Sequence, residues 1–412
     1  MQTNLADFIK DTPAGREADG ILRKCVHCGF CTATCPTYQL LGDELDGPRG
    51  RIYLMKQMLE GGEVTAKTRL HLDRCLTCRS CESTCPSGVE YGKLVDIGRE
   101  LVEQRVPRSG TEKLMRGLLA EVLPRPAMFA TATSLGRAFR VLLPWKLRAK
   151  LPAPAAPGGP WPAPRHARRM LALAGCVQPS LAPDINAATA RVLDRLGISL
   201  LEAPGAGCCG AVRFHLNRQQ AGRQDARRNI DAWTAALDQG AEGLVMTASG
   251  CGVFVREYDH LLQHDAGYAA KAQRIAAATR DASEVIAAEK EKLLALLGKR
   301  APGSSGKLAF HSPCTLQHGQ QIRGVAEELL RAAGFELTAV ADSHLCCGSA
   351  GTYSLLQPEL SLRLRNNKLA ALSAGQPAAI ATANIGCLTH LQIGTRLPVR
   401  HWIQALDEVL AK

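Results

Sequence analysis

One cysteine pattern occurs twice in the first quarter of the 412-residue chain, and it restricts the fold more than any other feature. The pattern is C-x2-C-x2-C-x3-C followed by proline, and its two copies comprise Cys25, Cys28, Cys31, Cys35 and Pro36, and Cys75, Cys78, Cys81, Cys85 and Pro86. Three thiolates separated by two residues each can wrap one face of a cubic cluster, because a short loop keeps successive Sγ atoms close together. This spacing is typical of domains that hold two [4Fe–4S] clusters. The pattern therefore predicts one-electron transfer.

The fourth cysteine of each copy lies too far along the chain to complete the cube that its three neighbours hold. In two-cluster ferredoxins it binds the other cluster, and the proline after it stops the chain from turning back. The predicted ligands are Cys25, Cys28, Cys31 and Cys85 for one cluster, called cluster A, and Cys75, Cys78, Cys81 and Cys35 for the other, called cluster B. Zinc sites and disulfides are the alternatives, but zinc usually takes two separated pairs of ligands, and disulfides are rare in a reducing compartment.

Length and composition limit the class of protein. The chain is long enough for two or three domains. No apolar signal-peptide segment is visible at residues 1–13, and no stretch approaches the ~20 apolar residues of a membrane-spanning helix. Sixteen cysteines without a secretory signal point to the cytosol, where thiols are kept for metals. The net charge of +12 raises the possibility of nucleic-acid binding. Because the basic residues are spread along the chain, an anionic membrane surface or an acidic partner explains the charge equally well.

The composition divides the chain into five parts and predicts an α+β multi-domain fold. A helical two-cluster ferredoxin-type domain is expected over 1–110, with a short amphipathic helix from Pro48 to Leu59. A helical connector over 111–150, with breaks at Pro124 and Pro126, and a proline-rich, semi-rigid linker over 151–168 follow. Strands and helices then alternate in a duplicated α/β Cys-Cys-Gly domain, whose first module is expected over 169–300 and its second over 307–412.

The other eight cysteines form a second duplication. Cys176, Cys208, Cys209 and Cys251 correspond to Cys314, Cys346, Cys347 and Cys387, and the first three pairs are each 138 residues apart. Both adjacent pairs belong to a Cys-Cys-Gly sequence, and short apolar strands lead into the cysteines. Ligands collect at the carboxyl ends of such strands, so each set of four thiolates is a candidate metal site or further iron–sulfur centre. Packed or redox-paired structural cysteines are the alternative.

Four histidines distinguish the second module from the first. His311, His344, His390 and His318 stand where the first module has Leu173, Ala206, Phe254 and Ser180. Imidazoles beside the cysteines suit a redox centre that also passes protons, and His390, three residues after Cys387, is alternatively a metal ligand. Histidines without a role are the other alternative. We interpret the second module as the working site and the first as structural.

Three longer stretches of the sequence indicate which family of iron–sulfur proteins the chain resembles. They are CVHCGFCTATCPTYQLLGDELDGPRGRIYLMKQMLEG, TANIGC and SHLCCGSAGTY. With them the chain resembles the iron–sulfur subunits of membrane-linked flavin dehydrogenases, and specifically the family of iron–sulfur subunits of bacterial glycolate oxidase. The resemblance covers both domains and the linker. It implies two FAD-containing partner subunits, of which one oxidises glycolate to glyoxylate, and electron transfer through this chain toward the respiratory quinone pool.

The resemblance further implies a cytoplasmic protein that associates peripherally with the inner membrane through the complex and binds no nucleic acid. The chain has no G-x-G-x-x-G after a predicted strand, so the flavin and substrate sites are expected on the partners. Related heterodisulfide reductase subunits have a further cysteine three residues after the last one, where this chain has Phe254 and His390. A five-cysteine centre is therefore not predicted.

Three other functions compete with this interpretation. The nearest is the iron–sulfur subunit of an anaerobic glycerol-3-phosphate dehydrogenase or of a lactate-utilisation complex. A thiol–disulfide reductase acting at the Cys-Cys-Gly centre is an alternative of another class. An iron–sulfur nucleic-acid-binding protein ranks last, because no DNA-reading motif is present.

Two basic regions have predicted contacts. Arg49 and Arg51, in the stretch GPRGR, are predicted to raise the potential of a cluster or to dock a flavin subunit, and an exposed basic loop is the alternative. The segment 111–148 is expected to bury an apolar helical face against a partner subunit or, alternatively, to dock on anionic lipid. The residues that suit these contacts are Leu114, Leu118, Val122 and Leu142 to Trp145, and Arg116, Arg137, Arg140, Lys146 and Arg148.

Overall fold

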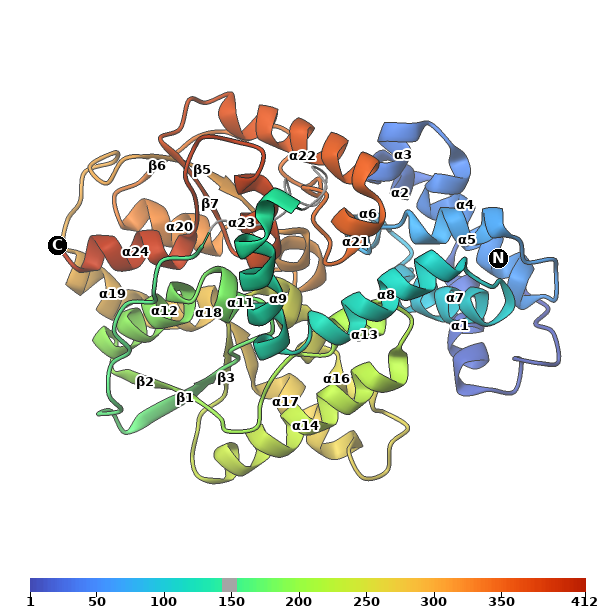
Figure 1. Cartoon of the computed structure of the whole chain (residues 1–412), viewed down its shortest axis with the longest axis horizontal. Helices are drawn as coiled ribbons and strands as arrows, with labels where there is room; N and C mark the ends of the chain where they lie inside the picture. The colour runs from blue at the N-terminus through green and yellow to red at the C-terminus, as the bar shows by residue number, and fades with distance from the viewer. Residues whose placement is uncertain (143–153) are drawn as a thin grey trace.

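The protein consists of a helical N-terminal domain followed by two α/β modules, in a computed structural model that describes residues 1–142 and 154–412 (Figure 1). This arrangement confirms the predicted fold class. The end of the predicted connector, with Trp145, Lys146 and Arg148, and the first three residues of the predicted linker lie outside the described residues.

The N-terminal domain packs its helices around α4 and α7. Its elements are α1 (Pro13–Lys24), α2 (Phe30–Ala33), α3 (Pro36–Leu41), the 3-10 turn η1 (Glu44–Asp46), α4 (Pro48–Leu59), α5 (Ala66–Asp73), α6 (Ser80–Thr84) and α7 (Tyr91–Arg105). Helix α4 has the bounds that the sequence predicts. Gly98 in α7 lets the helices approach closely, because a Cβ at this position would lie 2.5 Å from Sδ of the buried Met55.

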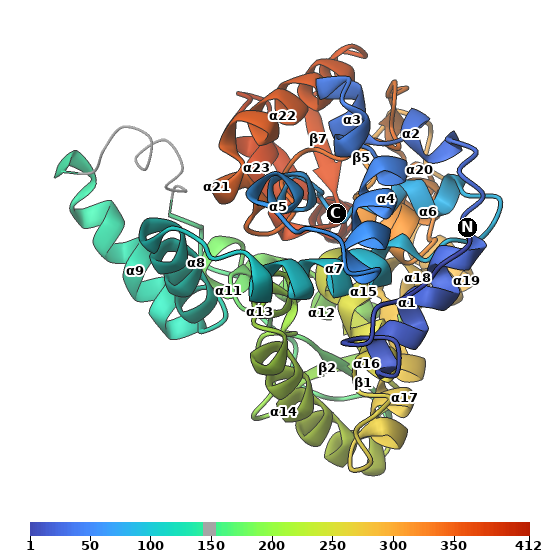
Figure 2. The same cartoon turned by 90° about the vertical axis from the view of Figure 1, so that its right-hand side faces the viewer.

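The connector forms an arm that projects from the body of the molecule (Figure 2). It contains α8 (Gly110–Val122), α9 (Pro126–Ala138) and the 3-10 turn η2 (Arg140–Leu142), so the chain breaks where the prolines predict. Leu114 and Leu118 are 64% and 53% exposed. Arg116, in contrast, is buried and bonds to Asp73 at 3.2 Å. The prediction that Arg116 faces lipid is therefore wrong.

Each module contains one parallel four-stranded sheet. The first comprises β1 (Arg168–Ala172), α11 (Gln178–Leu181), α12 (Asp184–Arg195), β2 (Ile198–Glu202), α13 (Ala211–His215), α14 (Gln219–Asp238), β3 (Leu244–Met246), α15 (Ser249–Arg256), α16 (Tyr258–Leu261), α17 (Ala269–Ala278), β4 (Thr279–Asp281), α18 (Ala282–Ala288) and α19 (Lys290–Leu297). The second comprises β5 (Lys307–His311), the π-helical turn η3 (Thr315–Gly319), α20 (Val325–Ala332), β6 (Glu336–Leu337), α21 (Tyr353–Leu356), α22 (Pro358–Ser373), β7 (Ala379–Thr382), α23 (Ile385–Gln392), β8 (Val399–His401) and α24 (Trp402–Leu410). Their strand orders, β2-β1-β3-β4 and β6-β5-β7-β8, correspond strand for strand.

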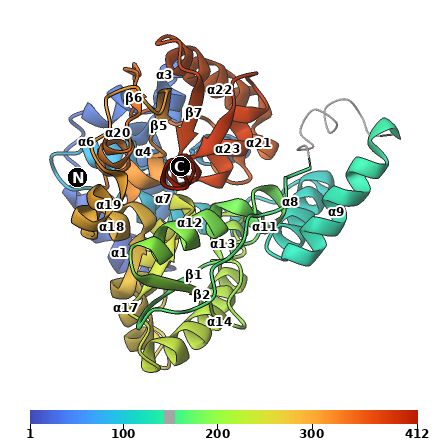
Figure 3. The ribbon, with the colours of Figure 1, turned by 90° about the vertical axis from the view of Figure 1, so that its left-hand side faces the viewer.

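One hydrophobic core spans both modules, and each module also has a further core of its own. Helices α18 and α19 of the first module contact α20 and α24 of the second, and α12 contacts α24 (Figure 3). Ile286 and Leu293 therefore belong to the same buried cluster as Leu308 and Trp402. The shared core thus crosses the sequence boundary between the modules.

The described part of the linker, 154–167, lies along the first module. The indole Nε1 of Trp161 donates to the carbonyl oxygen of Leu200 at 2.9 Å, and Nε of Arg165 donates to the Asp194 carboxylate at 2.9 Å. Strand β1 begins at Arg168, the last residue of the predicted linker. In the described segments, no helix is both long and apolar enough to cross a bilayer.

Candidate metal centres

The two ferredoxin-type motifs fold alike at the backbone level. His27 and Thr77, two residues after the first cysteine of each motif, have φ of 56° and 54°. Gly29 and Arg79, directly after the second cysteine, have φ of 85° and 60°. Left-handed residues at these spacings turn successive N–H groups toward one side, which favours an anionic group. The N–H of Thr77 accordingly donates to Sγ of Cys75 at 3.4 Å.

Each motif contributes to two pockets. One pocket is lined by Cys25, Cys28, Cys31 and Cys85, and a second is lined by Cys35, Cys75, Cys78 and Cys81. Each pocket therefore brings together the four cysteines that the sequence predicts for one cluster. Pro48, Cys81 and Tyr91 line both pockets, so the two sites are adjacent. The four sulfur donors of each pocket fit a four-iron cluster.

The two sites differ in exposure. Cys28 is exposed, and Val26 and Phe30 beside it are 68% and 61% exposed. In the second site, burial raises the pKa of Cys78 and Cys81 well above the ordinary value of a thiol, with neighbouring thiolates adding to the effect. Such thiols become thiolates only when a cation replaces their protons. The site predicted for cluster A therefore reaches the surface, and the site predicted for cluster B is interior.

Arg49 and Arg51 belong to the first turn of α4 and not to an exposed basic loop. Arg51 is 1% exposed, and its guanidinium donates to Thr37 Oγ1 at 3.2 Å and to the Asp46 carboxylate at 3.4 Å. Thr37 lines the pocket predicted for cluster B. Arg49 pairs with Glu44 at 2.7 Å near the surface. The prediction that Arg51 docks a partner subunit is therefore wrong, because the side chain is inaccessible.

The four cysteines of the first module converge at the carboxyl edge of its sheet. The thiol of Cys208 lies beside those of Cys176 and Cys209, and the thiol of Cys209 lies beside that of Cys251. These contacts, together with burial, raise the pKa of Cys176 and Cys209. The hydroxyl of Tyr258 donates to the Cys209 carbonyl oxygen at 2.7 Å. The four thiols of this module thus lie together, and the N–H of Gly210 donates to Sγ of Cys208 at 3.4 Å.

The second module repeats this arrangement. Sγ of Cys314 lies 3.8 Å from Sγ of Cys346, the thiol of Cys347 lies beside those of Cys346 and Cys387, and all four cysteines are buried. Gly348, with φ of 85°, is required after the pair, because a Cβ there would lie 2.6 Å from the Ser361 carbonyl oxygen.

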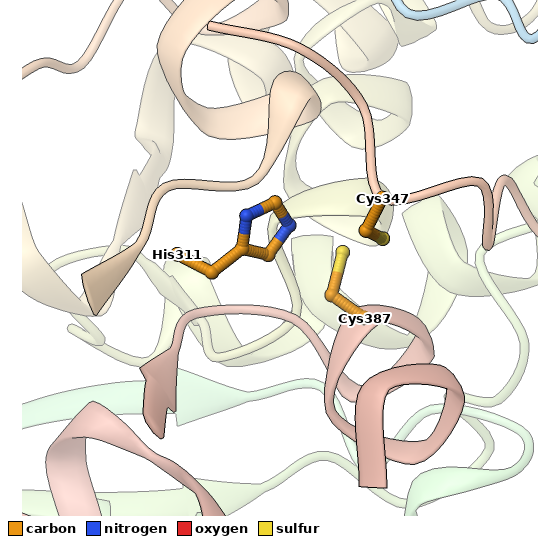
Figure 4. Close-up of side chains that lie close together, drawn as sticks. All are labelled: His311, Cys347 and Cys387. Atoms are coloured by element: carbon orange, nitrogen blue, oxygen red, sulfur yellow. The ribbon is translucent and has the colours of Figure 1, made fainter. Parts of the chain in front are cut away.

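The four histidines of the second module have different positions. Only His311, among the described histidines, lies with two cysteines, since its ring nitrogen and the sulfurs of Cys347 and Cys387 are all within 4.8 Å of one another (Figure 4). Nε2 of His390 lies 3.2 Å from Oγ of Ser361. His318 contacts the ferredoxin-type domain, since its Nδ1 lies 3.0 Å from Oγ of Ser83. Nε2 of His318 bonds to the backbone carbonyl oxygen of His344 at 2.9 Å. Of the four predicted histidines, the structure therefore brings only His311 within ligand distance of two cysteines.

Lys368 in α22 is a site residue that the sequence analysis missed. Its side chain is buried, and Nζ donates to the Asp342 carbonyl oxygen at 2.7 Å. Burial lowers the pKa of Lys368, while the neighbouring thiolates of Cys346 and Cys347 act in the opposite direction. A lysine in an ordinary helical pattern carries no sequence signal of burial, so only the fold reveals this cation.

The interior ferredoxin-type site adjoins the second module. Cys78 packs against a buried cluster that includes Cys314, Cys346 and Tyr353. Burial raises the pKa of Cys78, and the neighbouring thiolate of Cys314 raises it further. The guanidinium of Arg79, next to Cys78, forms a two-point ion pair with the carboxylate of Glu257, one contact of which is 2.8 Å. The ferredoxin-type domain is thus fixed to both modules beside its interior site.

Comparisons with known proteins agree with these parts. Residues 21–89 match the 4Fe-4S dicluster domain, and 170–256 and 308–392 each match the cysteine-rich domain. The chain is 57% identical to the glycolate oxidase iron-sulfur subunit of Escherichia coli K12, with 100% of both chains covered. It is 31% identical to a probable glycolate oxidase iron-sulfur subunit of Bacillus subtilis, over 92% of this chain and 90% of the relative. Lactate utilization protein A of Bacillus velezensis is 32% identical over 54% of this chain and 89% of that protein. The matched domains and the cysteine-lined pockets show that the chain binds iron–sulfur clusters.

Proposed function

Since the chain belongs to the family of glycolate oxidase iron–sulfur subunits, we propose that it conducts the electrons released when glycolate is oxidised to glyoxylate toward the respiratory quinone pool. The proposed partners are two FAD-containing subunits, through which the complex associates with the inner membrane. The observation that supports this proposal best is the pair of adjacent cysteine pockets, which begins at the surface and ends against the second module.

The proposed ligands follow the lining of the pockets. They are Cys25, Cys28, Cys31 and Cys85 for cluster A, and Cys75, Cys78, Cys81 and Cys35 for cluster B. When bound, a [4Fe–4S] cluster supplies one-electron redox chemistry, which lets a two-electron flavin donor be emptied in two steps. The crossed cysteines hold the two sites adjacent, and the burial of Cys35, Cys75 and Cys81 keeps water away from the second one.

The flavin partner is proposed to bind at the exposed edge of cluster A. Cys28 is the exposed cysteine of that site, and the apolar side chains of Val26 and Phe30 flank it. Apolar side chains on a surface commonly mark a contact with another protein. Electrons then leave from the opposite side, where Cys78 adjoins the buried thiols of the second module.

The experiment is to co-express this chain with its two flavin subunits, purify the complex without oxygen, and add glycolate. We expect glycolate to produce the electron paramagnetic resonance signal of reduced [4Fe–4S] clusters, and glycerol 3-phosphate and lactate to produce none. The isolated chain is the control: dithionite should reduce its clusters, and glycolate should not. Reduction of the complex by glycerol 3-phosphate but not by glycolate would refute the proposed substrate.

Lactate is the second candidate substrate. The observation that favours it is the similarity to lactate utilization protein A, which covers 54% of this chain. Glycolate is preferred because the similarity to the glycolate oxidase subunits extends over 92% of the chain or more. The same reduction experiment separates the two acids.

A further inference from the structure

We propose that the second module holds an additional iron–sulfur centre and that the imidazole of His311 is a nitrogen ligand of this centre, together with the thiolates of Cys347 and Cys387. The redox role of the centre rests on the proposed function. The ligand set itself rests on the geometry at the carboxyl ends of β5 and β7.

The first observation is that the ring of His311 has no partner of its own. His311 is the last residue of β5, its side chain is 2% exposed, and neither Nδ1 nor Nε2 has a hydrogen-bond partner in the described structure. Burying polar groups without partners costs free energy. The imidazole faces the sulfurs of Cys347 and Cys387 (Figure 4), and the three ligand atoms lie within 4.8 Å of one another. A metal bound between them would satisfy a nitrogen that the fold otherwise leaves unsatisfied.

The second observation comes from the first module. Leu173 stands at the position that corresponds to His311, three residues before the first cysteine of its set, and it is buried. An apolar side chain therefore fills this place in the same fold without the cost of desolvating an imidazole. Packing alone does not account for a histidine in the second module.

The third observation is the buried cation at Lys368. Its charge acts on the thiolates of Cys346 and Cys347. The first module has Asn229 at the corresponding place, as judged from the matching contacts that Gly210 and Gly348 make with α14 and α22. A buried cation beside buried thiols favours their ionised, metal-binding form. The second module thus has a nitrogen donor that the first module lacks, together with a buried cation beside its thiols.

The donor set favours an iron–sulfur centre over a zinc ion. Five possible donors are present, since Cys314 and Cys346 adjoin the three ligands named above, whereas structural zinc sites take four. The site also adjoins Cys78 of cluster B. An iron–sulfur centre at this place can exchange electrons with cluster B, whereas a zinc ion has no redox chemistry. A neutral imidazole in place of a thiolate makes a cluster less negative and raises its potential, which suits an acceptor that follows the two ferredoxin-type clusters.

The test uses the full complex, prepared without oxygen from cells supplied with 15N-labelled histidine. Iron, sulfide and zinc are counted per chain, and pulsed electron paramagnetic resonance detects nitrogen coupled to the cluster spins. We expect clearly more than the about eight irons of two cubes, and a histidine nitrogen coupling whose isotope shift follows the label. His311→Leu, which copies Leu173, should abolish that coupling and leave the signals of the two ferredoxin-type clusters. The matched control, His390→Phe, copies Phe254 and should keep the coupling.

A third variant guards against misfolding. His311→Cys supplies a sulfur ligand and should retain the excess iron while losing the nitrogen coupling. Persistence of the coupling in His311→Leu, or a complex with about eight irons and one zinc per chain, would overturn the inference. Glycolate reduction of the ferredoxin-type clusters is measured in the same samples. If it succeeds, the proposed function stands even where the His311 inference fails, so the two failures are distinguishable.

Discussion

The imidazole Nε2 of His401 donates a hydrogen bond to the backbone carbonyl oxygen of Thr247, 2.9 Å away, and so joins the second module to the first. Nδ1 of the same ring accepts the N–H of Ile403 at 3.3 Å and begins α24. The side chain is fully buried, and this burial lowers the pKa of His401 from 6.5 to about 4. Both nitrogens are engaged only while the ring is neutral.

We expect the protein to lose stability as the pH falls from about 6.5 toward 4, because the unfolded chain then binds a proton that the folded His401 does not bind. The contribution is complete above the unfolded pKa and decreases by at most about 1.4 kcal/mol per pH unit below it. His401→Asn retains a helix-capping side chain but does not titrate. Its melting midpoint should therefore fall less between pH values of about 7.5 and 5.5 than that of the wild type. An equal fall in both proteins would contradict the assignment.

Crossed ligation predicts a specific pattern of iron loss. Cys28→Ser and Cys85→Ser should each remove about four of the about eight ferredoxin-type irons, because both cysteines line the pocket of cluster A. The double variant of Cys28 and Cys85 should lose no more iron than either single variant. The double variant of Cys28 and Cys35 should lose both clusters, because Cys28 lines the pocket of cluster A and Cys35 that of cluster B. Iron and sulfide analysis checks the pattern, and uncrossed ligation would give the opposite result for the two double variants.

Arg51→Gln is expected to destabilise the N-terminal domain by about 3 kcal/mol, since it removes a buried cation from Asp46. The variant also loses the hydrogen bond from Nε to the His71 carbonyl oxygen at 2.7 Å. Removing a positive charge beside its pocket should in addition lower the potential of cluster B. Melting curves and a redox titration measure the two effects. Arg49→Gln is the matched control, because its half-exposed pair with Glu44 is worth about 1 kcal/mol or less.

The ion pair between Arg79 and Glu257 joins the ferredoxin-type domain to the first module. Arg79→Gly suits the backbone, because φ at Arg79 is 60° and the equivalent residue of the other motif is Gly29. We therefore expect Arg79→Gly to keep both clusters but to increase proteolysis between the two parts. Glu257→Gln should have a similar effect, and the double variant should add little to either, with a coupling of about 1–3 kcal/mol. Additive effects would show that the pair does not hold the two parts together.

The fold class and the grouping of the cysteines into two pockets follow from the sequence, because the spacing of the cysteines is a local property. The limits of helix α4 and the duplication of the modules follow from similar short-range patterns. The choice among the four histidines of the second module does not follow from such short-range patterns. His390 is closer in sequence to Cys387 than His311 is, but the turn of α23 carries its ring to Ser361, whereas the end of β5 brings His311 to two cysteines from elsewhere in the chain.

Burial and long-range pairing were likewise hidden from the sequence. Arg51 lies in a basic stretch that resembles a surface loop, yet it is 1% exposed, because the 3-10 turn η1 places Asp46 beside it in the interior. Arg79 and Glu257 are 178 residues apart, and no periodicity relates them. Such contacts depend on how complete domains pack, which composition and spacing do not describe.

The core common to the two modules has a consequence for how such a chain could arise. One module alone would leave Ile286, Leu293 and their neighbours in water, so a half-length ancestor would have needed a second copy of itself to cover them. Fusion of two copies keeps these side chains buried against each other, and the two halves can then differ in sequence. Leu173 in one half and His311 in the other show that the two halves differ at this corresponding place.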